Sequence, residues 1–129
     1  MRHRQPLAEA SRRTSEVALR AFSKLADRWQ LEPKARQVLL GVPERTYYNW
    51  IRSPEKATPD RDKLERISYV LGIRAALAAI FGENPEADEW LKRRNIDFGG
   101  ESPLNRMLGG NLGDLAQVRA YLDRARFIW

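Results

Sequence analysis

The chain has 129 residues, of which 43% are hydrophobic, so it can build one modest core or two small ones, and we do not expect wholesale disorder. With no cysteine and a single histidine, His3, it lacks the residues for a disulfide framework, a thiolate metal site or a histidine-based catalytic pair. We therefore expect a binding protein that uses no metal or cofactor, and not an enzyme.

The net charge of +6 is concentrated near the N-terminus. Residues 1–34 contain eight basic and four acidic residues, whereas residues 96–129 contain four of each. This excess fits a nucleic-acid partner, but solubility alone also accounts for it. No apolar run is long enough to span a bilayer, and residues 1–6 lack the apolar stretch of a signal peptide, so we expect a cytoplasmic location.

Residues 1–13 are basic, with one proline and few apolar positions, which predicts a flexible arm. Two interpretations are open for this arm: it contacts phosphates or the minor groove of DNA, or it is a solvated tail. From Thr14 or Ser15 to Gln30, apolar residues recur with helical spacing, which predicts a helix with a wide buried stripe. The stripe consists of Val17, Ala18, Ala21, Phe22, Leu25, Ala26 and Trp29.

Residues 33–40 predict a short helix that stops at Gly41, and a second helix follows from about Glu44. This helix, turn and helix, with Thr46 and Trp50 five and nine residues after Gly41, resembles the helix-turn-helix of Xre-type regulators. The residues expected to face the core of the motif are Leu40, Val42, Tyr47, Trp50 and Ile51.

The outward positions of the second helix have the side chains of a DNA-reading surface. Arginine can fork onto guanine, asparagine onto adenine, and tyrosine can contact a thymine methyl or a phosphate. Two departures from the motif, Gln37 in place of a small residue and the acidic Glu44, leave open a degenerate motif kept for structure or dimerisation. The predicted DNA-binding residues are Arg36, Arg45, Thr46, Tyr48, Asn49 and Arg52, with Arg36 and Thr46 assigned to phosphates.

After a loop at residues 53–59, Thr58 and Pro59 are the predicted start of a helix that Gly72 breaks. A further apolar segment runs from residue 73 to Gly82, and Asn84 begins a helix that ends near residue 94. Residues 95–101 form an irregular connector. No segment alternates with a period of two for long enough to indicate a strand, so the fold class is all-α.

Two helix boundaries are written into residues 102–114. Ser102 is a predicted N-cap with Pro103 at the first helical position, and Gly109 or Gly110 takes the left-handed conformation that closes this short helix. Asn111 then begins a long helix. Its predicted apolar face is Leu112, Leu115, Val118, Leu122 and Ala125.

Residues 76–129 resemble the toxin-binding domain of the MbcA/ParS/Xre antitoxins. The resemblance is carried by Phe98-Gly99-Gly100, Ser102-Pro103-Leu104, Arg106-Met107-Leu108, Gly110-Asn111, Asp114-Leu115, Val118-Arg119, Tyr121-Leu122-Asp123 and Ala125-Arg126. It implies a helical domain whose partner is a toxin of the RES type, which consumes NAD or uses it to modify targets. It also implies that the C-terminal end enters the active-site cleft of the toxin and blocks the substrate.

The last residues, 127–129, are three large apolar side chains at the end of a helix, a pattern typical of an interface. Folding back onto the core is the alternative, and Phe98 likewise fits either a partner surface or a gap in the core. The predicted toxin-binding residues are Phe98, Ser102, Pro103, Leu104, Arg106, Met107, Arg119, Arg126, Phe127, Ile128 and Trp129.

These observations predict a flexible arm at residues 1–13, an Xre-like helix-turn-helix domain at residues 14–75 and a toxin-binding domain at residues 76–129. We expect a dimeric antitoxin of a type II toxin–antitoxin system that occludes a RES-domain toxin and represses its own operon by binding operator DNA. The alternative is a stand-alone helix-turn-helix transcriptional regulator whose C-terminal helices only dimerise.

Overall fold

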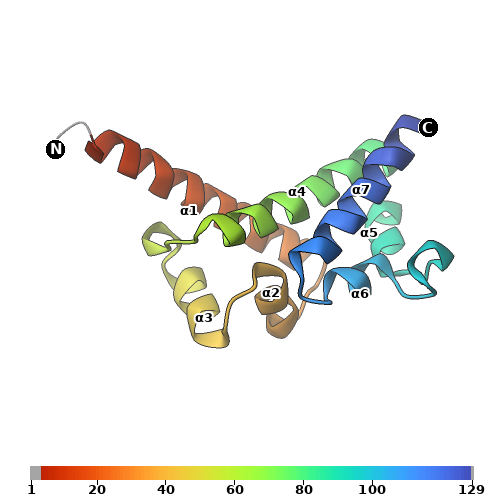
Figure 1. Ribbon diagram of the computed structural model, residues 1–129, viewed down its shortest axis with the longest axis horizontal. Helices are drawn as coiled ribbons and strands as arrows, with labels where there is room; N and C mark the ends of the chain where they lie inside the picture. Colours follow the sequence, from red (N-terminus) through yellow and green to blue (C-terminus); the bar gives the residue numbers. More distant parts are fainter. Residues whose placement is uncertain (1–3, 129) are drawn as a thin grey trace. The chain divides into compact units, whose positions relative to one another are not determined.

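The computed structural model describes residues 4–128, and the side chains of residues 9–127 (Figure 1). These residues are helical and include no strand, which confirms the predicted all-α class. The chain divides into two compact units, Met1–Ser68 and Tyr69–Trp129. The elements in order are α1 (Arg4–Arg28), α2 (Pro33–Leu40), α3 (Glu44–Arg52), the 3-10 turn η1 (Pro54–Lys56), α4 (Arg61–Phe81), α5 (Pro85–Lys92), the 3-10 turn η2 (Ile96–Phe98), α6 (Pro103–Met107) and α7 (Leu112–Ile128).

Helix α1 is longer than the sequence predicted. It begins at Arg4, so the predicted start at Thr14 or Ser15 is wrong. Residues 7–13 are rich in alanine, arginine and glutamate, which favour the helix even where residues 9–14 bury nothing. Val17 is also not part of the buried stripe, since its side chain is 61% exposed and Leu19 is buried in the core. The mobility expected of residues 1–13 stays a prediction.

Helices α2 and α3 lie on one side of α1 (Figure 1) and form the predicted helix-turn-helix. Gly41 ends α2 in the left-handed conformation with φ 70°, as its position required. A Cβ on Gly41 would lie 2.7 Å from Nε of Arg66, which packs over the turn and donates a hydrogen bond to Asp62 at 3.1 Å. Leu40, Val42 and Tyr47 are buried as predicted.

Helix α4 differs from the prediction in where it begins and in continuing past Gly72. It begins at Arg61, and Asp60 rather than Thr58 caps it by accepting the Lys63 N–H at 3.0 Å. Gly72 does not break the helix, which runs without interruption from Arg61 to Phe81. A single glycine is tolerated inside a helix when a neighbouring element uses the space that it leaves.

The second unit buries apolar residues from four helices and η2. Gly82 follows the end of α4 with φ 77°, and the Asn84 side chain accepts the Glu86 N–H at 2.9 Å to cap α5, as predicted. Helix α5 ends at Lys92, two residues before the predicted end. The core consists of Val70, Ile73, Ala76, Leu77, Ala87, Leu91, Phe98, Met107, Leu115, Val118 and Leu122.

The start of α6 and the turn between α6 and α7 confirm the predicted helix boundaries. The Ser102 hydroxyl accepts the Asn105 N–H at 3.0 Å, and Gly110 is the glycine with positive φ, at 90°. Gly109 leaves room for the Asp114 carboxylate, because a Cβ at Gly109 would lie 2.5 Å from Oδ2 of Asp114. That same oxygen accepts the Asn111 N–H at 3.2 Å and so caps α7. None of the helices in the described part of the chain combines the length and apolar content needed to cross a lipid bilayer.

Candidate functional site

The outer face of α3 carries exposed side chains at one-turn spacing. Arg45, Tyr48, Asn49 and Arg52 are all exposed, as the sequence predicted, while Tyr47 is buried beneath them. The side chains of Arg45, Asn49 and Arg52 form no hydrogen bond or ion pair with any other residue that the structure describes. These groups are therefore available to an external partner, and their chemistry suits base edges and phosphates.

One neighbour of this face, Ile51, differs from its predicted placement. Ile51 does not face inward: it is exposed, and lies three residues after Tyr48 on the same side of the helix. This spacing was the signal in the sequence that could have identified Ile51 as an exposed residue. Trp50 and Thr46 are half-buried.

Arg36 makes contacts inside the first unit instead of facing a partner. Its side chain is only 17% exposed and forms an ion pair with Asp27 at 2.9 Å. Its Nε also donates to the Leu31 carbonyl oxygen at 2.9 Å. The predicted phosphate contact of Arg36 has no support from this placement, since the guanidinium joins α2 to the segment that follows α1.

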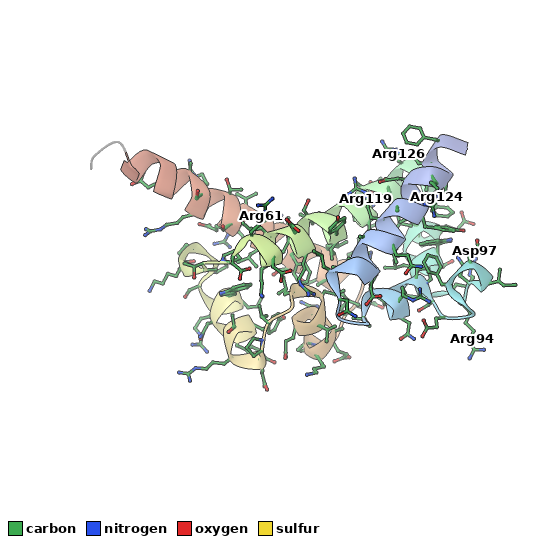
Figure 2. All side chains as sticks on the ribbon, viewed as in Figure 1. Arg61, Arg94, Asp97, Arg119, Arg124 and Arg126 are labelled. Atoms are coloured by element: carbon green, nitrogen blue, oxygen red, sulfur yellow. The ribbon has the colours of Figure 1, made fainter. Side chains whose placement is uncertain are left out.

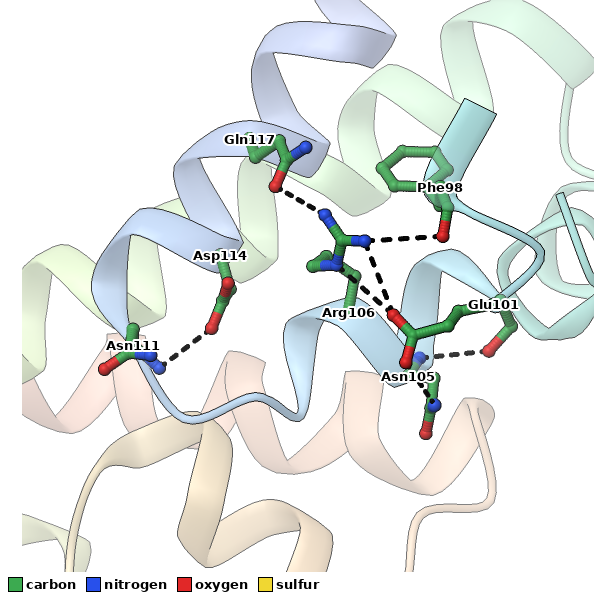
Figure 3. Close-up of polar contacts among 8 residues, drawn as sticks. Phe98, Glu101, Asn105, Arg106, Asn111, Asp114 and Gln117 are labelled. Carbon is green, nitrogen blue, oxygen red and sulfur yellow. Dashed lines mark hydrogen bonds and ion pairs between the residues drawn. The ribbon is translucent and has the colours of Figure 1, made fainter. Parts of the chain in front are cut away.

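In the second unit, Arg106 is the centre of a polar network (Figure 3). Its guanidinium donates to Gln117 at 2.9 Å and to the Phe98 carbonyl oxygen at 3.3 Å, and pairs with Glu101 at 3.4 Å. It also lies 5.9 Å from the centroid of the Phe98 ring, within cation–π range. This network ties η2, α6 and α7 together.

Several residues predicted to bind the toxin are core residues of the second unit. Phe98 is 2% exposed, with ring centroids 6.3 Å from Trp90 and 5.0 Å from Tyr121. Of its two open interpretations, the structure therefore gives the core. Pro103 and Met107 are also buried, while Ser102 and Leu104 are half-buried.

Arg119 also packs inside the second unit. A Cβ on Gly72 would overlap its guanidinium, and its Nε bonds both carboxylate oxygens of Asp123, at 3.2 and 3.1 Å. Gly72 thus provides the space in which Arg119 crosses α4.

The end of α7 has a different character. Arg124 and Arg126 are exposed and extend from the helix (Figure 2), and the Phe127 side chain is 87% exposed. The side chains of Arg126 and Phe127 form no hydrogen bond, ion pair or ring contact with the described residues. The Ile128 side chain, Trp129 and His3 lie outside what the structure describes.

A small hollow beside α7 was not foreseen from the sequence. It has a volume of about 90 Å³ and is lined by apolar and aromatic residues that include Phe81, Trp90, Tyr121 and Ala125. The Trp90 and Tyr121 rings stack at 5.9 Å. The Tyr121 hydroxyl donates to Asp97 at 2.7 Å, and this bond raises the pKa of Tyr121.

Ile96 on η2 is a further exposed apolar residue of the second unit that the sequence did not single out, and its side chain is 90% exposed. It lies in a connector without periodic pattern, so nothing in its sequence context indicated its exposure. Within the described residues, no group of three histidine, cysteine, aspartate or glutamate side chains is placed to hold a metal ion.

Comparison with known proteins assigns a family to each part of the chain. Residues 9–72 match the Antitoxin Xre-like helix-turn-helix domain. Residues 76–127 match the Antitoxin Xre/MbcA/ParS C-terminal toxin-binding domain. The chain is also 38% identical over 127 residues to the uncharacterized protein y4oB of Sinorhizobium fredii, an alignment that covers 98% of this chain and 95% of y4oB. No solved structure matches.

Proposed function

Because the chain belongs to the Xre/MbcA/ParS family of antitoxins, we propose that it neutralises a RES-domain, NAD-consuming toxin by placing the end of α7 in the toxin's active site. The family domains are those of an antitoxin with a helix-turn-helix and a toxin-binding domain. The RES class of the toxin and steric occlusion as the mechanism are the proposed parts. The cytoplasmic location stays a prediction.

The observation that carries this proposal is the exposed end of α7. The Phe127 side chain is almost fully exposed, and Arg126, which precedes it in the sequence, is exposed as well. Moving an exposed phenylalanine side chain out of water and into the surface of a partner lowers the free energy. Arginine is enriched at interface hot spots, and a guanidinium can form paired hydrogen bonds with carboxylates of the partner.

The hollow beside α7 supports the same surface. Tyr121 and Ala125 line it and precede Arg126 on the same helix, so a toxin that covers the end of α7 can also place an apolar side chain in this hollow. The residues that form this part of the proposed interface are Ile96, Trp90, Tyr121, Ala125, Arg126 and Phe127.

The proposal extends to autorepression by the first unit. The exposed face of α3 carries Arg45, Tyr48 and Asn49, whose side chains match the donor and acceptor patterns of the major groove. We place two copies of the chain on a two-fold symmetric operator, since a helix-turn-helix commonly reads two half-sites as a dimer. A regulator whose C-terminal helices only dimerise is the competing function.

The proposed inhibition of a toxin is tested with the protein that co-purifies with an N-terminally tagged chain. Its NAD consumption is measured after separation and again with increasing amounts of added chain. Replacing Arg126 and Phe127 by alanine should weaken inhibition about 30-fold or more, because truncating an interface hot spot costs about 2 kcal/mol or more.

Val17→Ala is the matched control, since Val17 is an exposed apolar residue of the other unit. It should inhibit as the unchanged chain does. Full inhibition by the Arg126/Phe127 variant, or a chain that elutes with no NAD-consuming protein, would contradict the proposed occlusion and favour the plain regulator.

The proposed DNA binding is tested with a duplex that carries the promoter region of the chain's own gene. Replacing Arg45 and Asn49 by alanine should abolish the preference for this duplex over a random duplex while inhibition of the toxin is unchanged. Lys34→Ala, at an exposed position on α2, is the control. An unaltered preference in the double variant would show that α3 is not the reading element.

A further inference from the structure

Two hollows are lined by η1 and its neighbours in the first unit. The larger, of about 350 Å³, is lined by the last turn of α3 and by η1, with Asn49, Arg52 and Lys56 on its wall. The smaller, of about 250 Å³, is lined by η1, Thr58 and Arg12 of α1. Lys56 and Ala57 line both hollows, and the linings together extend from α3 across η1 to α1. We call the two hollows together the η1 groove.

The cations of the η1 groove differ from several other cations of the first unit. Arg12, Arg52 and Lys56 are exposed, and none of them pairs with an acidic group in the described part of the chain. Glu55 is the acidic residue on the lining. By contrast, several basic residues elsewhere in this unit form ion pairs: Arg20 with Glu16, Arg36 with Asp27, Arg61 with Glu65, and both Lys63 and Arg66 with Asp62.

The position of the groove relates it to the outer face of α3. Asn49 and Arg52 belong both to that face and to the groove wall. A helix of this length spans about 14 Å and the major groove is about 12 Å wide, so when α3 lies in the major groove its last turn reaches the bordering phosphates. The segment that follows α3 then faces the sugar–phosphate backbone.

We infer that the η1 groove binds the sugar–phosphate backbone of the same duplex that α3 reads, with Arg12, Arg52 and Lys56 as sequence-independent phosphate contacts. The hydroxyls of Ser53 and Thr58 on its wall are additional donors to phosphate oxygens. This inference rests on the proposed DNA binding and adds a role for α1, whose Arg12 brings charge from outside the helix-turn-helix.

The dependence of affinity on salt tests this inference. Each phosphate contact that is removed should lower the slope of log K against log salt concentration by about 0.9 for duplex DNA. The full chain is compared with Lys56→Gln and Arg12→Gln on two duplexes of equal length, the promoter region of its own gene and a random sequence. Both variants should bind both duplexes more weakly by a similar factor, with the slope reduced by about 0.9 in each.

Lys24→Gln is the matched control, because Lys24 is an exposed cation of α1 that lines neither hollow. It should leave the slope unchanged. Toxin inhibition by Lys56→Gln and Arg12→Gln should equal that of the unchanged chain, which shows that the variants are folded.

The inference is overturned if the unchanged chain prefers its promoter duplex and both variants keep its salt slope. If millimolar inorganic phosphate binds the unchanged chain but not the variants, and the variants keep full DNA affinity, the groove is assigned to free anions and the inference is also overturned. A chain that binds neither duplex overturns the proposed autorepression and this inference together, whereas the toxin assay is independent of both.

Discussion

The guanidinium of Arg119 on α7 lies so close to the Cα of Gly72 on α4 that a Cβ at Gly72 would overlap its Nη1. In the first unit, Arg66 packs in the same manner over Gly41. In both places the missing side chain of a glycine gives a long, charged side chain room to cross the backbone of another helix. The close approach at Gly72 leads to a direct test.

Gly72→Ala should stabilise the protein less than alanine does at an open helical position, where it favours a helix over glycine by about 0.5–1 kcal/mol. The added methyl group displaces the end of the flexible Arg119 side chain and weakens its bonds to Asp123, which offsets part of that gain. Urea unfolding measures the difference. Gly113→Ala is the control, since no atom lies within 4 Å of a Cβ built at that helical position, and it should be neutral or stabilising. A Gly72→Ala variant that gains as much stability as Gly113→Ala would show that Arg119 moves aside freely.

Ser102→Ala should lower the free energy of unfolding by about 1 kcal/mol, because it removes the side-chain oxygen that caps α6. Ser68→Ala, at an exposed position within α4, serves as the comparison and should change stability little. The measurement is the midpoint of urea unfolding. Equal midpoints for the two variants would mean that the cap does not stabilise α6.

Arg106→Ala should lower the free energy of unfolding by about 1–2 kcal/mol, a value reduced because the side chain is partly exposed. It breaks the hydrogen bonds to Gln117 and the Phe98 carbonyl and the ion pair with Glu101. Arg94→Ala, an exposed arginine of the same unit, is the control. If the folded Arg106→Ala variant is stable but fails to inhibit the toxin, Arg106 binds the toxin directly and is not mainly structural.

The Tyr121–Asp97 hydrogen bond predicts a pH dependence at the alkaline end. The bond to Asp97, followed by burial, raises the pKa of Tyr121 above its ordinary 10.0. Since the folded-state pKa exceeds the unfolded one, this contribution to stability is complete below pH 10 and is lost as pH rises through the folded-state pKa. Chemical unfolding at increasing pH should show this loss, and Tyr121→Phe should remove it. The same alkaline loss in the phenylalanine variant would assign it to another group.

Sequence reasoning succeeded where short-range chemistry decides the structure. The caps at Asn84 and Ser102 and the glycines at 41 and 82 were recognised because each acts on its own neighbouring backbone. Gly72 was misread as a helix breaker, because its role depends on Arg119, which is distant in sequence. Helical periodicity likewise identified the buried side of α7.

The candidate sites were only partly readable from the sequence. The outward row of α3 follows from helical spacing, but Arg36 and Phe98 look like binding residues by type and are held inside the fold by Asp27, Trp90 and Tyr121. Both are residue types that are common at interfaces, but both side chains lie largely inside the fold. The η1 groove was also invisible, since it joins α1 to η1, and α1 was expected to begin after Arg12.

The tryptophans of the two units differ in a way that serves spectroscopy. Trp29 is fully buried, whereas Trp50 and Trp90 are half-buried on the walls of the larger η1 hollow and of the α7 hollow. Indole emission responds to the water around the ring, so each proposed interface has its own intrinsic fluorophore. An emission change that Trp50→Phe removes therefore reports on DNA, and one that Trp90→Phe removes reports on the toxin, so the order in which the two partners arrive can be followed.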